Sequence, residues 1–391
     1  METEVIVVGA GPVGLVAANR LADLGIACAV VEAADAPAAD LRASTFHPPT
    51  LEMLDALDLT APLIAAGLVS PTWQVRQHET GERAVFDLAV LKDDTRYPFR
   101  LQCEQRILCA LAEARLAGKA ALLRGRAATG VMQDGDKVTV TLDDGATLQA
   151  RFAIGADGAR SQTRRAAGVA FDGATYPETT ILATTRFSFQ DHLEGLSNVN
   201  YCWSRHGTFS LLRLPDVWRC SLYADPGESE KAALAPKSIG RKLQRIVPLA
   251  GGHDVLEIRP YRIHQRIVES YRKGRILLAG DAAHLNAPSG GMGMNGGIHD
   301  AFALADALAE VLRGADEGHL DRYDRKRRPI AKEQILAQAH RNRTRMQERD
   351  PAARRAELAR LQAIAADTAK ARDFLLHSSM IAGLRQAEAI V

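Results

Sequence analysis

The sequence predicts an α/β protein with three parts: a domain built around a parallel sheet, a mainly antiparallel second sheet, and a helical C-terminus. At residues 4–25 a buried strand runs into a glycine-rich turn and a helix. Strand-like runs rich in aromatic residues occupy 176–268, and helical periodicity dominates from about 320. Two further strands, near 152–158 and 275–281, end in Asp-Gly or Gly-Asp. Because such endings suit the carboxyl edge of a parallel sheet, the first domain is expected to be discontinuous.

The N-terminal stretch has the pattern of a dinucleotide-binding unit. The apolar run 5–8 predicts a buried parallel strand, and the helix that follows ends at Gly25. Between them, one glycine permits a tight turn, a second lets a pyrophosphate approach the backbone, and a third lets the helix pack closely. The positive end of the helix favours the phosphates. This Rossmann-like motif comprises Gly9, Gly11, Pro12, Val13 and Gly14.

A second apolar run, 29–31, ends at Glu32. A carboxylate in this position can hold both hydroxyls of a ribose, and an acid there suits a ribose without a phosphate. The first domain is therefore expected to bind FAD or NAD. Arg42, in the following loop, is interpreted equally well as a cofactor contact or as an exposed loop residue.

Composition limits the classes of function. The chain has 391 residues, and 49 Lys and Arg against 47 Asp and Glu give a net charge of +2, which offers no support for a nucleic-acid partner. Five scattered cysteines show neither a C-x-x-C pair nor the spacing of metal ligands, so they predict reduced thiols and no metal site. With no signal peptide and no apolar run long enough to cross a bilayer, we expect a cytoplasmic protein without a membrane partner.

Periodicity and turn residues predict the elements between the motifs. His47 and the two prolines after it predict a loop, and Thr50 is expected to cap a helix through Leu59. The stretch 72–100 alternates apolar and polar residues, which predicts strands that leave the first domain. Gln105 is expected to open the next helix. Further strands are expected at 120–125, 137–142 and 147–154.

Asp157 and Gly158 lie where a buried strand meets a short helix over 161–167. Ligands of open α/β sheets bind at such strand ends, although an Asp-Gly pair is also common in simple turns. Gly280 and Asp281 end the next buried strand, and Asp281 can accept a hydrogen bond from a ribityl hydroxyl.

A loop with many glycines follows, and then a helix expected from Ile298 to Leu312. Bare N–H groups beside a positive helix end stabilise negative charge on a flat ligand such as reduced flavin. His284 is interpreted as a structural residue rather than a base.

The stretch 176–268 predicts a second sheet that lies over the first domain. Its strand-like runs are 180–187, 199–204, 208–214, 217–224 and 255–264, and a helix is expected near 237–247. Its arginines are expected to be mostly solvated, with one or two facing a cavity that holds an anionic substrate. They are Arg186, Arg205, Arg213, Arg219, Arg259, Arg262 and Arg266.

The helical tail is expected to pack on the cofactor domain, with the charge run 325–328 on a solvated face. The predicted domains are a discontinuous FAD-binding domain, a substrate domain and a C-terminal helical region. Their residues are 1–71 with 101–175 and 269–320, then 72–100 with 176–268, and finally 321–391.

In this order and spacing, the three motifs resemble those of the single-component FAD-dependent aromatic hydroxylases, whose archetype is para-hydroxybenzoate hydroxylase. The resemblance covers about residues 1–345. It implies that the first three glycines hold the FAD pyrophosphate, that Glu32 holds the adenosine ribose and that Asp281 binds the ribityl chain. It also implies that Arg42, Gln105, Asp157 and Gly158 contact FAD. Pro288 would lie beside the reacting flavin edge, and Gly293, Met294 and Asn295 would contact the ring system. Cys109 departs from the family, in which an acidic residue is common.

The resemblance also implies the reaction: NADH or NADPH reduces FAD, O2 forms a C4a-hydroperoxyflavin, and one oxygen atom is transferred to an electron-rich ring. The expected substrate is a small aromatic or N-heteroaromatic compound, phenolic or carboxylated, and the protein is expected to be a monomer or homodimer. A base that withdraws a phenolic proton would activate the ring. The candidates for this role are Tyr201 and Tyr223, followed by His47, His206 and Arg213.

Several other classes share part of this pattern. A ubiquinone-pathway hydroxylase shares every motif and acts on a lipid-like ring, but the sheet with its arginines does not suggest the apolar mouth that it needs. A flavin-dependent halogenase is disfavoured because the three tryptophans each stand alone. A non-oxygenating flavin oxidoreductase and a regulatory flavoprotein stay open as alternatives.

Overall fold

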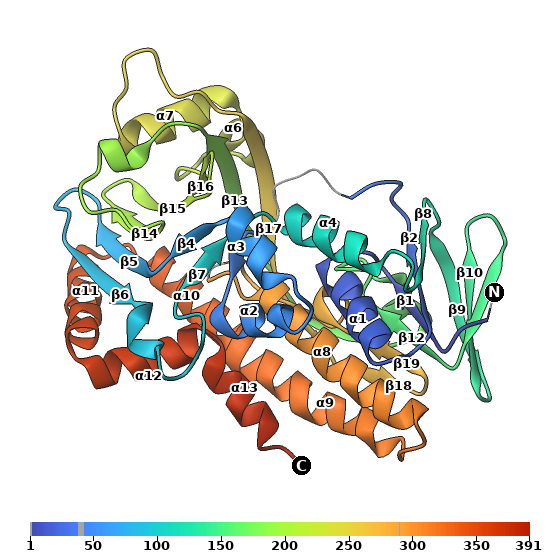
Figure 1. The fold of residues 1–391 in the computed structure, drawn as a ribbon. Coiled ribbons are helices and arrows are strands. Elements are labelled where there is room, and N and C mark those ends of the chain that lie inside the picture. The colour runs from blue at the N-terminus through green and yellow to red at the C-terminus, as the bar shows by residue number, and fades with distance from the viewer. Residues whose placement is uncertain (1, 38–42, 289) are drawn as a thin grey trace.

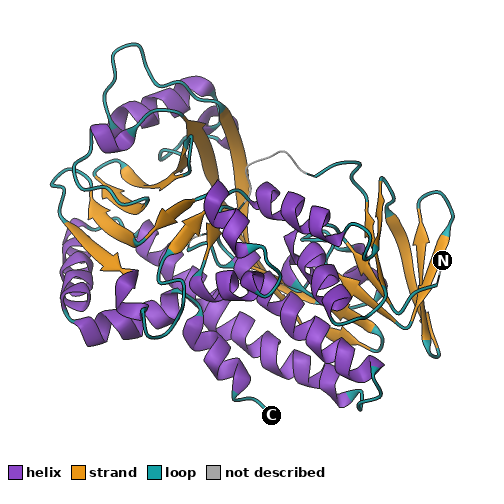
Figure 2. Ribbon diagram, viewed as in Figure 1, coloured by secondary structure: helices purple, strands orange, loops and turns teal. Residues whose placement is uncertain are grey.

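The computed structural model describes residues 2–37, 43–288 and 290–391. Figure 1 shows two sheet regions on opposite sides of the molecule, with the helices of the last hundred residues passing beneath both. Figure 2 separates the strands from these helices. Among the described residues, no helix is long and apolar enough to span a bilayer.

The first region is a six-stranded sheet in the order β18-β19-β12-β1-β2-β8, parallel except for β18. Val5 and Val7 of its central strand pack on helices α1, α4 and α8 on one face. Ile6 and Val8 pack on a three-stranded sheet on the other. This confirms the predicted α/β class with a mainly parallel sheet. The strands are β1 (Val5–Val8), β2 (Cys28–Glu32), β8 (Ala121–Arg124), β12 (Phe152–Gly155), β18 (Arg272–Lys273) and β19 (Ile276–Leu278), with β9 (Ala128–Asp134), β10 (Lys137–Leu142) and β11 (Thr147–Ala150) on the second face.

The second region is an eight-stranded sheet in the order β20-β17-β13-β16-β15-β14-β5-β6. Only the β14–β5 pair is parallel, so the prediction of a mainly antiparallel sheet is confirmed. The strands are β5 (Thr72–Gln77), β6 (Arg83–Asp87), β13 (Phe171–Thr185), β14 (Val199–Ser204), β15 (Gly207–Arg213), β16 (Trp218–Leu222), β17 (Glu257–Val268) and β20 (His284–Leu285). A small sheet of β3 (Thr45–Phe46), β7 (Arg100–Gln102) and β4 (Leu68–Ser70) completes the strands.

The helices before residue 292 are α1 (Pro12–Asp23), α2 (Pro48–Asp55), α3 (Thr60–Ala66), α4 (Gln105–Leu116), α5 (Gln162–Ala166), α6 (Glu230–Ala233) and α7 (Pro236–Ile246). Those after it are α8 (Gly293–Leu312), α9 (Gly318–Ile330), a π-helical turn (Ala331–Leu336), α10 (Ala337–Gln347), α11 (Pro351–Ala366), α12 (Thr368–Ser378) and α13 (Ile381–Glu388).

Three local predictions were wrong. His47 and the prolines do not form a loop: His47 is the N-cap of α2 and Pro48 starts it, because the fixed φ of proline fits a first helical turn. Thr50 therefore lies inside that helix, and α3 is separate. The expected strand 147–154 is two strands in two different sheets, β11 and β12. Helix α8 begins at Gly293, so Met294 and Asn295 lie in its first turn rather than in a loop.

The C-terminal helices cover more than the cofactor region. Helix α9 packs on α8, whereas α11 and α12 pack against β6 and the turn that follows it. Their buried residues Leu358, Leu361 and Leu375 join Trp73 and Phe86 in one apolar cluster. The prediction that the tail packs on the cofactor domain therefore holds for α9 but not for α11 and α12, the red helices at the lower left of Figure 1, of which α11 lies beside β6.

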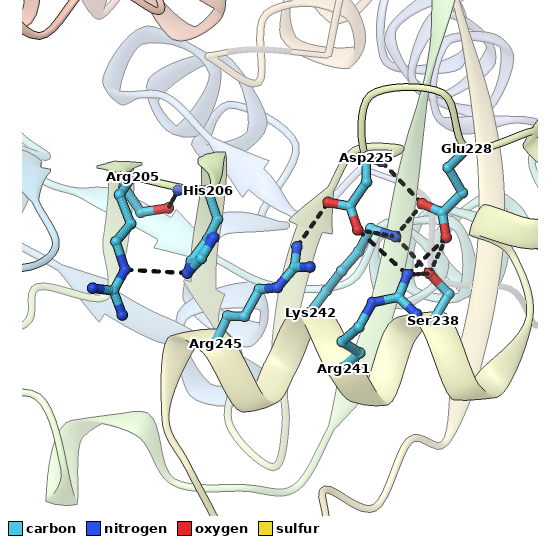
Figure 3. Close-up of polar contacts among 9 residues, drawn as sticks. Arg205, His206, Asp225, Glu228, Ser238, Arg241, Lys242 and Arg245 are labelled. Carbon is cyan, nitrogen blue, oxygen red and sulfur yellow. Dashed lines mark hydrogen bonds and ion pairs between the residues drawn. The ribbon is translucent and has the colours of Figure 1, made fainter.

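An ion-pair network holds α7 against one face of the eight-stranded sheet (Figure 3). Lys242 contacts Glu228 at 2.5 Å, and Arg245 contacts Asp225 at 2.8 Å. Burial alone would raise the pKa of Glu228, but the contacts of its carboxylate, the one with Lys242 first, lower it to about 2. Each charge of this network has a partner, so the network is structural.

Candidate active site

The three N-terminal glycines meet different surroundings. A Cβ at Gly14 would lie 1.9 Å from the Gly9 oxygen, and one at Gly9, where φ is +108°, would lie 2.5 Å from the Ala156 oxygen. The fold itself therefore requires these two glycines. A Cβ at Gly11 would meet no heavy atom within 4 Å in the described part of the chain. The N-terminus of α1 thus borders an open space suited to a pyrophosphate.

Glu32 lies at the carboxyl end of β2 and faces the same turn. Its Oε2 accepts from the Ala10 N–H at 2.7 Å and its Oε1 from the Ala34 N–H at 2.9 Å. The side chain is only partly buried, so its remaining lone pairs are available to a ribose. Gln105 is the first residue of α4, and its N–H donates to the Ala43 oxygen. Arg42 lies outside the described residues.

Asp157 and Gly158 follow β12, next to the glycine turn. The Asp157 Oδ2 accepts from the N–H and the hydroxyl of Thr163, at 3.0 and 3.1 Å, and its Oδ1 accepts from the Ser161 hydroxyl. The carboxylate therefore holds the first turn of α5. Gly158 has a φ of +75°, and a Cβ there, like one at Gly11, would meet no heavy atom of the described residues within 4 Å.

Gly280 and Asp281 follow β19, the neighbour of β12. Gly280 has a φ of +60°, and a Cβ there would lie 2.8 Å from a methyl group of Val13. The same side chain closely approaches Gly297 in α8. Val13 therefore links the glycine turn at 9–14 to Gly280 and to α8. The exposed Asp281 side chain lies beside this contact.

The loop before α8 is tied to β3 and α2. The Asn295 amide donates to the Thr45 and Gly291 oxygens, at 2.8 and 2.6 Å, and its Oδ1 accepts from the His47 N–H at 2.9 Å. His47 Nε2 lies 2.8 Å from the Gly290 oxygen, and because a carbonyl only accepts, Nε2 carries the proton. Burial, together with Arg100, lowers the pKa of His47 to about 3. His47 is thus a neutral anchor of the loop.

A buried charge cluster lies behind this loop. Asp300 accepts from His284 Nε2 and from Arg327 Nε, each at 2.8 Å, and all three side chains are at most 2% exposed. Burial alone would raise the pKa of Asp300, but Arg327 and His284 hold it below its usual value. His284 is therefore engaged in this cluster, as its interpretation as a structural residue requires.

A cavity borders the same loop. Tyr201 of β14, Trp73 of β5 and Arg100 of β7 line it, together with Gly290 and Met292. Helices α10 and α12 close it with Gln338, Asn342, Arg345, Met346, Phe374 and Ser378. The cavity thus lies where the eight-stranded sheet, the loop before α8 and the C-terminal helices meet.

Aromatic rings and one guanidinium determine the chemistry of the cavity wall. Trp73 packs on Phe86, with ring centroids 4.6 Å apart, and meets Tyr201 edge-on at 6.0 Å. The guanidinium of Arg100 lies 4.9 Å from the Trp73 ring centroid and interacts with the Tyr201 hydroxyl. Burial lowers the pKa of Arg100, and Tyr201 opposes that shift.

The structure brings together some of the predicted catalytic residues and separates others. Tyr201 lines the cavity, whereas Tyr223 follows β16 and interacts with Thr180. Strand register places Arg213 on the same face as Leu211, opposite to Tyr201. His206 is exposed on a hairpin and pairs with Arg205, as the left of Figure 3 shows.

The arginine prediction is confirmed for the four exposed side chains, Arg186, Arg205, Arg259 and Arg262. Arg219 is instead 5% exposed and donates to the Ser44 hydroxyl at 3.2 Å.

Arg100, Trp73 and the α10 residues were not predicted as parts of a site. The alternating pattern over 72–100 contained the first two, but no signal connected them to the tail. Arg100 is only 3% exposed, although it lies in a stretch expected to be a strand excursion.

Comparisons with known proteins identify the family. A family model described as an FAD binding domain matches residues 2–338. The para-nitrophenol 4-monooxygenase of Pseudomonas sp. (strain WBC-3) is 34% identical over 396 residues, which cover 98% of this chain and 97% of that protein. Pentachlorophenol 4-monooxygenase of Sphingobium chlorophenolicum is 31% identical over 350 residues, 87% of this chain and 64% of that protein.

A solved structure is similar over the whole chain. The crystal structure of p-nitrophenol 4-monooxygenase from Pseudomonas putida DLL-E4 matches with a TM-score of 0.91 at 32% identity, covering 98% of both chains. The glycine turn, the open space at Gly11 and the loop before α8 fit the flavin that this family uses. The chain therefore belongs to the FAD-dependent aromatic hydroxylases and is an aromatic monooxygenase with NAD(P)H as its electron donor.

Proposed function

We propose that the cavity lined by Tyr201, Trp73 and Arg100 is the substrate site, and that its substrate is a small phenol or hydroxypyridine. The observation that carries this proposal is the position of the cavity. It touches Gly290 of the loop that precedes α8, so a ring inside it lies beside the proposed flavin edge. The two relatives reported above are monooxygenases of para-nitrophenol and pentachlorophenol, which supports this substrate class. A monooxygenase of 6-hydroxy-3-succinoylpyridine from Pseudomonas putida, 32% identical over 335 residues, adds the hydroxypyridines.

The cofactor contacts are part of the same proposal. Gly9, Gly11, Pro12, Val13 and Gly14 border the pyrophosphate, Glu32 holds the ribose, and Gln105, Asp157, Gly158, Gly280 and Asp281 complete the cofactor groove. Pro288, Gly293, Met294 and Asn295 border the ring system of the flavin. When bound, FAD supplies the chemistry by which NAD(P)H and O2 deliver one oxygen atom to the substrate.

The chain's own residues position and shield the substrate. Trp73 and Phe374 give the cavity an aromatic, apolar lining, and α10 and α12 close it against water. Tyr201 places a hydroxyl at the same wall, within reach of a polar substituent of the ring. His47 and Asn295 keep the loop in place through their bonds to its backbone and to each other, and neither side chain lines the cavity.

The domain division, the cellular location and the oligomeric state are also proposals. The eight-stranded sheet is proposed as the substrate domain, the six-stranded sheet as the FAD-binding domain, and 321–391 as a third region that closes the substrate cavity. The five buried cysteines suit a reducing compartment, which supports a cytoplasmic location. A monomer or homodimer is proposed as the oligomeric state.

The test measures NAD(P)H consumption, hydrogen peroxide release and product mass with the FAD-loaded protein across phenols and hydroxypyridines. We expect one class to accelerate NAD(P)H oxidation with little peroxide and to gain one oxygen atom. If every compound leaves the rate unchanged, or all reducing equivalents appear as peroxide, the substrate-site proposal fails in favour of a non-oxygenating flavin oxidoreductase.

The variants Trp73→Leu and Phe374→Leu test the position of the site. Both side chains line the cavity, so each change is expected to raise KM at least tenfold, about 1.4 kcal/mol of binding. Trp218→Leu is the matched control, because this buried tryptophan on β16 packs in the apolar cluster with α7 and does not line the cavity. Equal effects of all three changes would contradict the assigned site.

A further inference from the structure

The buried guanidinium of Arg100 has no acidic partner. Its side chain is 3% exposed, and no carboxylate contacts it among the residues that the structure describes. Its contacts are the Trp73 ring, the Tyr201 hydroxyl and a long hydrogen bond, 3.5 Å, to the Ser378 oxygen. A buried cation without a counter-charge is costly, so its retention here requires a compensating role.

Two buried donors at the same wall lack acceptors. Arg100 Nε and Trp73 Nε1 each have no hydrogen-bond acceptor within the described chain, and both residues line the cavity. Both nitrogens can only donate. A ligand that satisfies them must therefore bring an acceptor, and a negatively charged oxygen would also balance the guanidinium.

The other groups around Arg100 do not supply this negative charge. Arg345 of α10 is the second cation at the cavity, and it contacts Glu357 at 3.2 Å. That carboxylate also binds Arg360 at 2.7 Å, so it is shared between two arginines. His47 is neutral, Tyr201 is a hydroxyl, and the remaining polar groups of the wall, Gln338, Asn342 and Ser378, carry no charge.

We propose that Arg100 is the specificity-determining residue of the cavity and binds an anionic oxygen of the aromatic ring, so that a phenol enters this site as its phenolate. The inference rests on the proposed substrate site. The proton that the phenol loses passes to the buffer, and no bond to carbon changes in this step. An ionised phenol is also the more electron-rich ring, which suits attack by an electrophilic oxygen. Tyr201 holds Arg100 in place and can donate to the same oxygen.

The test observes binding without turnover. FAD-loaded protein is mixed with 4-nitrophenol in the absence of NAD(P)H, at a pH below the pKa of the free phenol. Because only the anion has the yellow band, the difference spectrum reports the fraction of bound phenol that is ionised. We expect the wild type to bind the anion, so that binding releases a proton to the medium.

Variants of Arg100 test whether this residue binds the anion. Arg100→Met is expected to bind 4-nitrophenol at least tenfold more weakly and without the band of the anion, whereas Arg100→Lys keeps part of that band. Arg76→Met is the matched control: this arginine is also buried, at 5% exposed, and lies on β5, but it donates to the Glu194 oxygen outside the cavity. Arg76→Met is expected to retain the anion's band. FAD content and Tm of each variant show whether it has folded.

The second arm uses benzoate, whose carboxylate could replace the phenolate as the anionic oxygen. Displacement of 4-nitrophenol by benzoate, lost in Arg100→Met, assigns both oxyanions to Arg100, and failure to displace restricts the site to phenolates. The proposal is overturned if a folded Arg100→Met variant binds the anion as the wild type does. It is likewise overturned if the wild type binds the protonated phenol. If binding follows Arg100 but no phenol is ever oxygenated, the proposed function fails while the anion site stands.

Discussion

At the scale of single residues, Gly14 and Gly11 belong to the same motif but are glycines for different reasons. Gly14 is required because a Cβ would overlap the Gly9 oxygen, whereas the space around Gly11 is open in the chain itself. The φ of Gly11, −74°, is accessible to any residue. The reason for glycine at position 11 therefore lies outside the polypeptide, in the proposed pyrophosphate.

The first prediction separates these roles. Gly11→Ala is expected to leave the Tm of the FAD-free protein unchanged and to weaken FAD binding at least tenfold, about 1.4 kcal/mol. Gly14→Ala is expected to lower the stability of the FAD-free protein by about 1–3 kcal/mol, because the helix must move from the strand. Thermal melts and FAD titration of both variants provide the check. Unchanged FAD affinity in Gly11→Ala would contradict the assigned pyrophosphate site.

The second prediction concerns pH and His47. Burial lowers its folded-state pKa from 6.5 to about 3, so below about pH 6.5 the unfolded chain binds a proton that the folded chain excludes. The free energy of unfolding therefore falls as the pH drops from about 6.5 toward 3, by up to about 1.4 kcal/mol per pH unit from this group.

His47→Gln keeps a side-chain donor toward the Gly290 oxygen but does not titrate. Its stability is expected to fall less steeply than that of the wild type over this pH range. Urea unfolding at several pH values measures the difference between the two slopes. Identical slopes would show that His47 does not reach the buried, neutral state described above.

At the scale of elements, sequence and structure agree where a contact is local in the chain. The strand, glycine turn and helix at 5–23 follow from residues that are neighbours, and so does the mainly antiparallel character of 176–268. The start of α2 could not be read correctly because a Pro-Pro pair suits both a loop and a first helical turn.

The cavity proposed as the substrate site could not be predicted for a different reason. Its walls come from β5, β7 and β14 and from α10 and α12, which are separated by as much as the whole central part of the chain. Periodicity in the tail indicated helices but not that Phe374 would lie against Trp73. Tyr201 was identified as a candidate because it lies on a strand of the covering sheet, whereas Arg100 gave no pattern that distinguishes it from a surface arginine.

The third prediction tests α12 as a wall of the cavity. Phe374 stacks on Phe86 with centroids 4.7 Å apart and lines the cavity, so Phe374→Ala enlarges it. We expect KM to rise for small phenols and the preference to shift toward phenols with bulky ring substituents. Leu361→Ala in the same apolar cluster is the control, because it costs about 2–5 kcal/mol of stability without lining the cavity. Steady-state kinetics on a series of halogenated phenols would show the shift, and the same shift in Leu361→Ala would contradict this role of α12.

At the scale of the whole molecule, the six-stranded and the eight-stranded sheets are joined through the stretch around Gly280 and Asp281. The residues after Gly280 and Asp281 form β20, which pairs with β17 at the edge of the eight-stranded sheet, His284 with Ile267 and Leu285 with Arg266. The stretch that follows the proposed cofactor contacts is therefore hydrogen-bonded to the sheet proposed as the substrate domain. All three tryptophans, Trp73, Trp203 and Trp218, lie in the eight-stranded sheet, so their fluorescence reports on that sheet alone.

The fourth prediction uses these probes. FAD binding at the glycine stretches is expected to stabilise the distant sheet, by about 2.7 kcal/mol when free FAD is at 100 times its Kd. Tryptophan fluorescence and flavin release should then follow one unfolding transition, and excess FAD should move that transition to higher temperature. In Gly11→Ala the same FAD concentration should move it less. A tryptophan transition that ignores FAD while flavin release responds to it would show that the sheets unfold separately, and that the β17–β20 pairing does not couple cofactor binding to the substrate cavity.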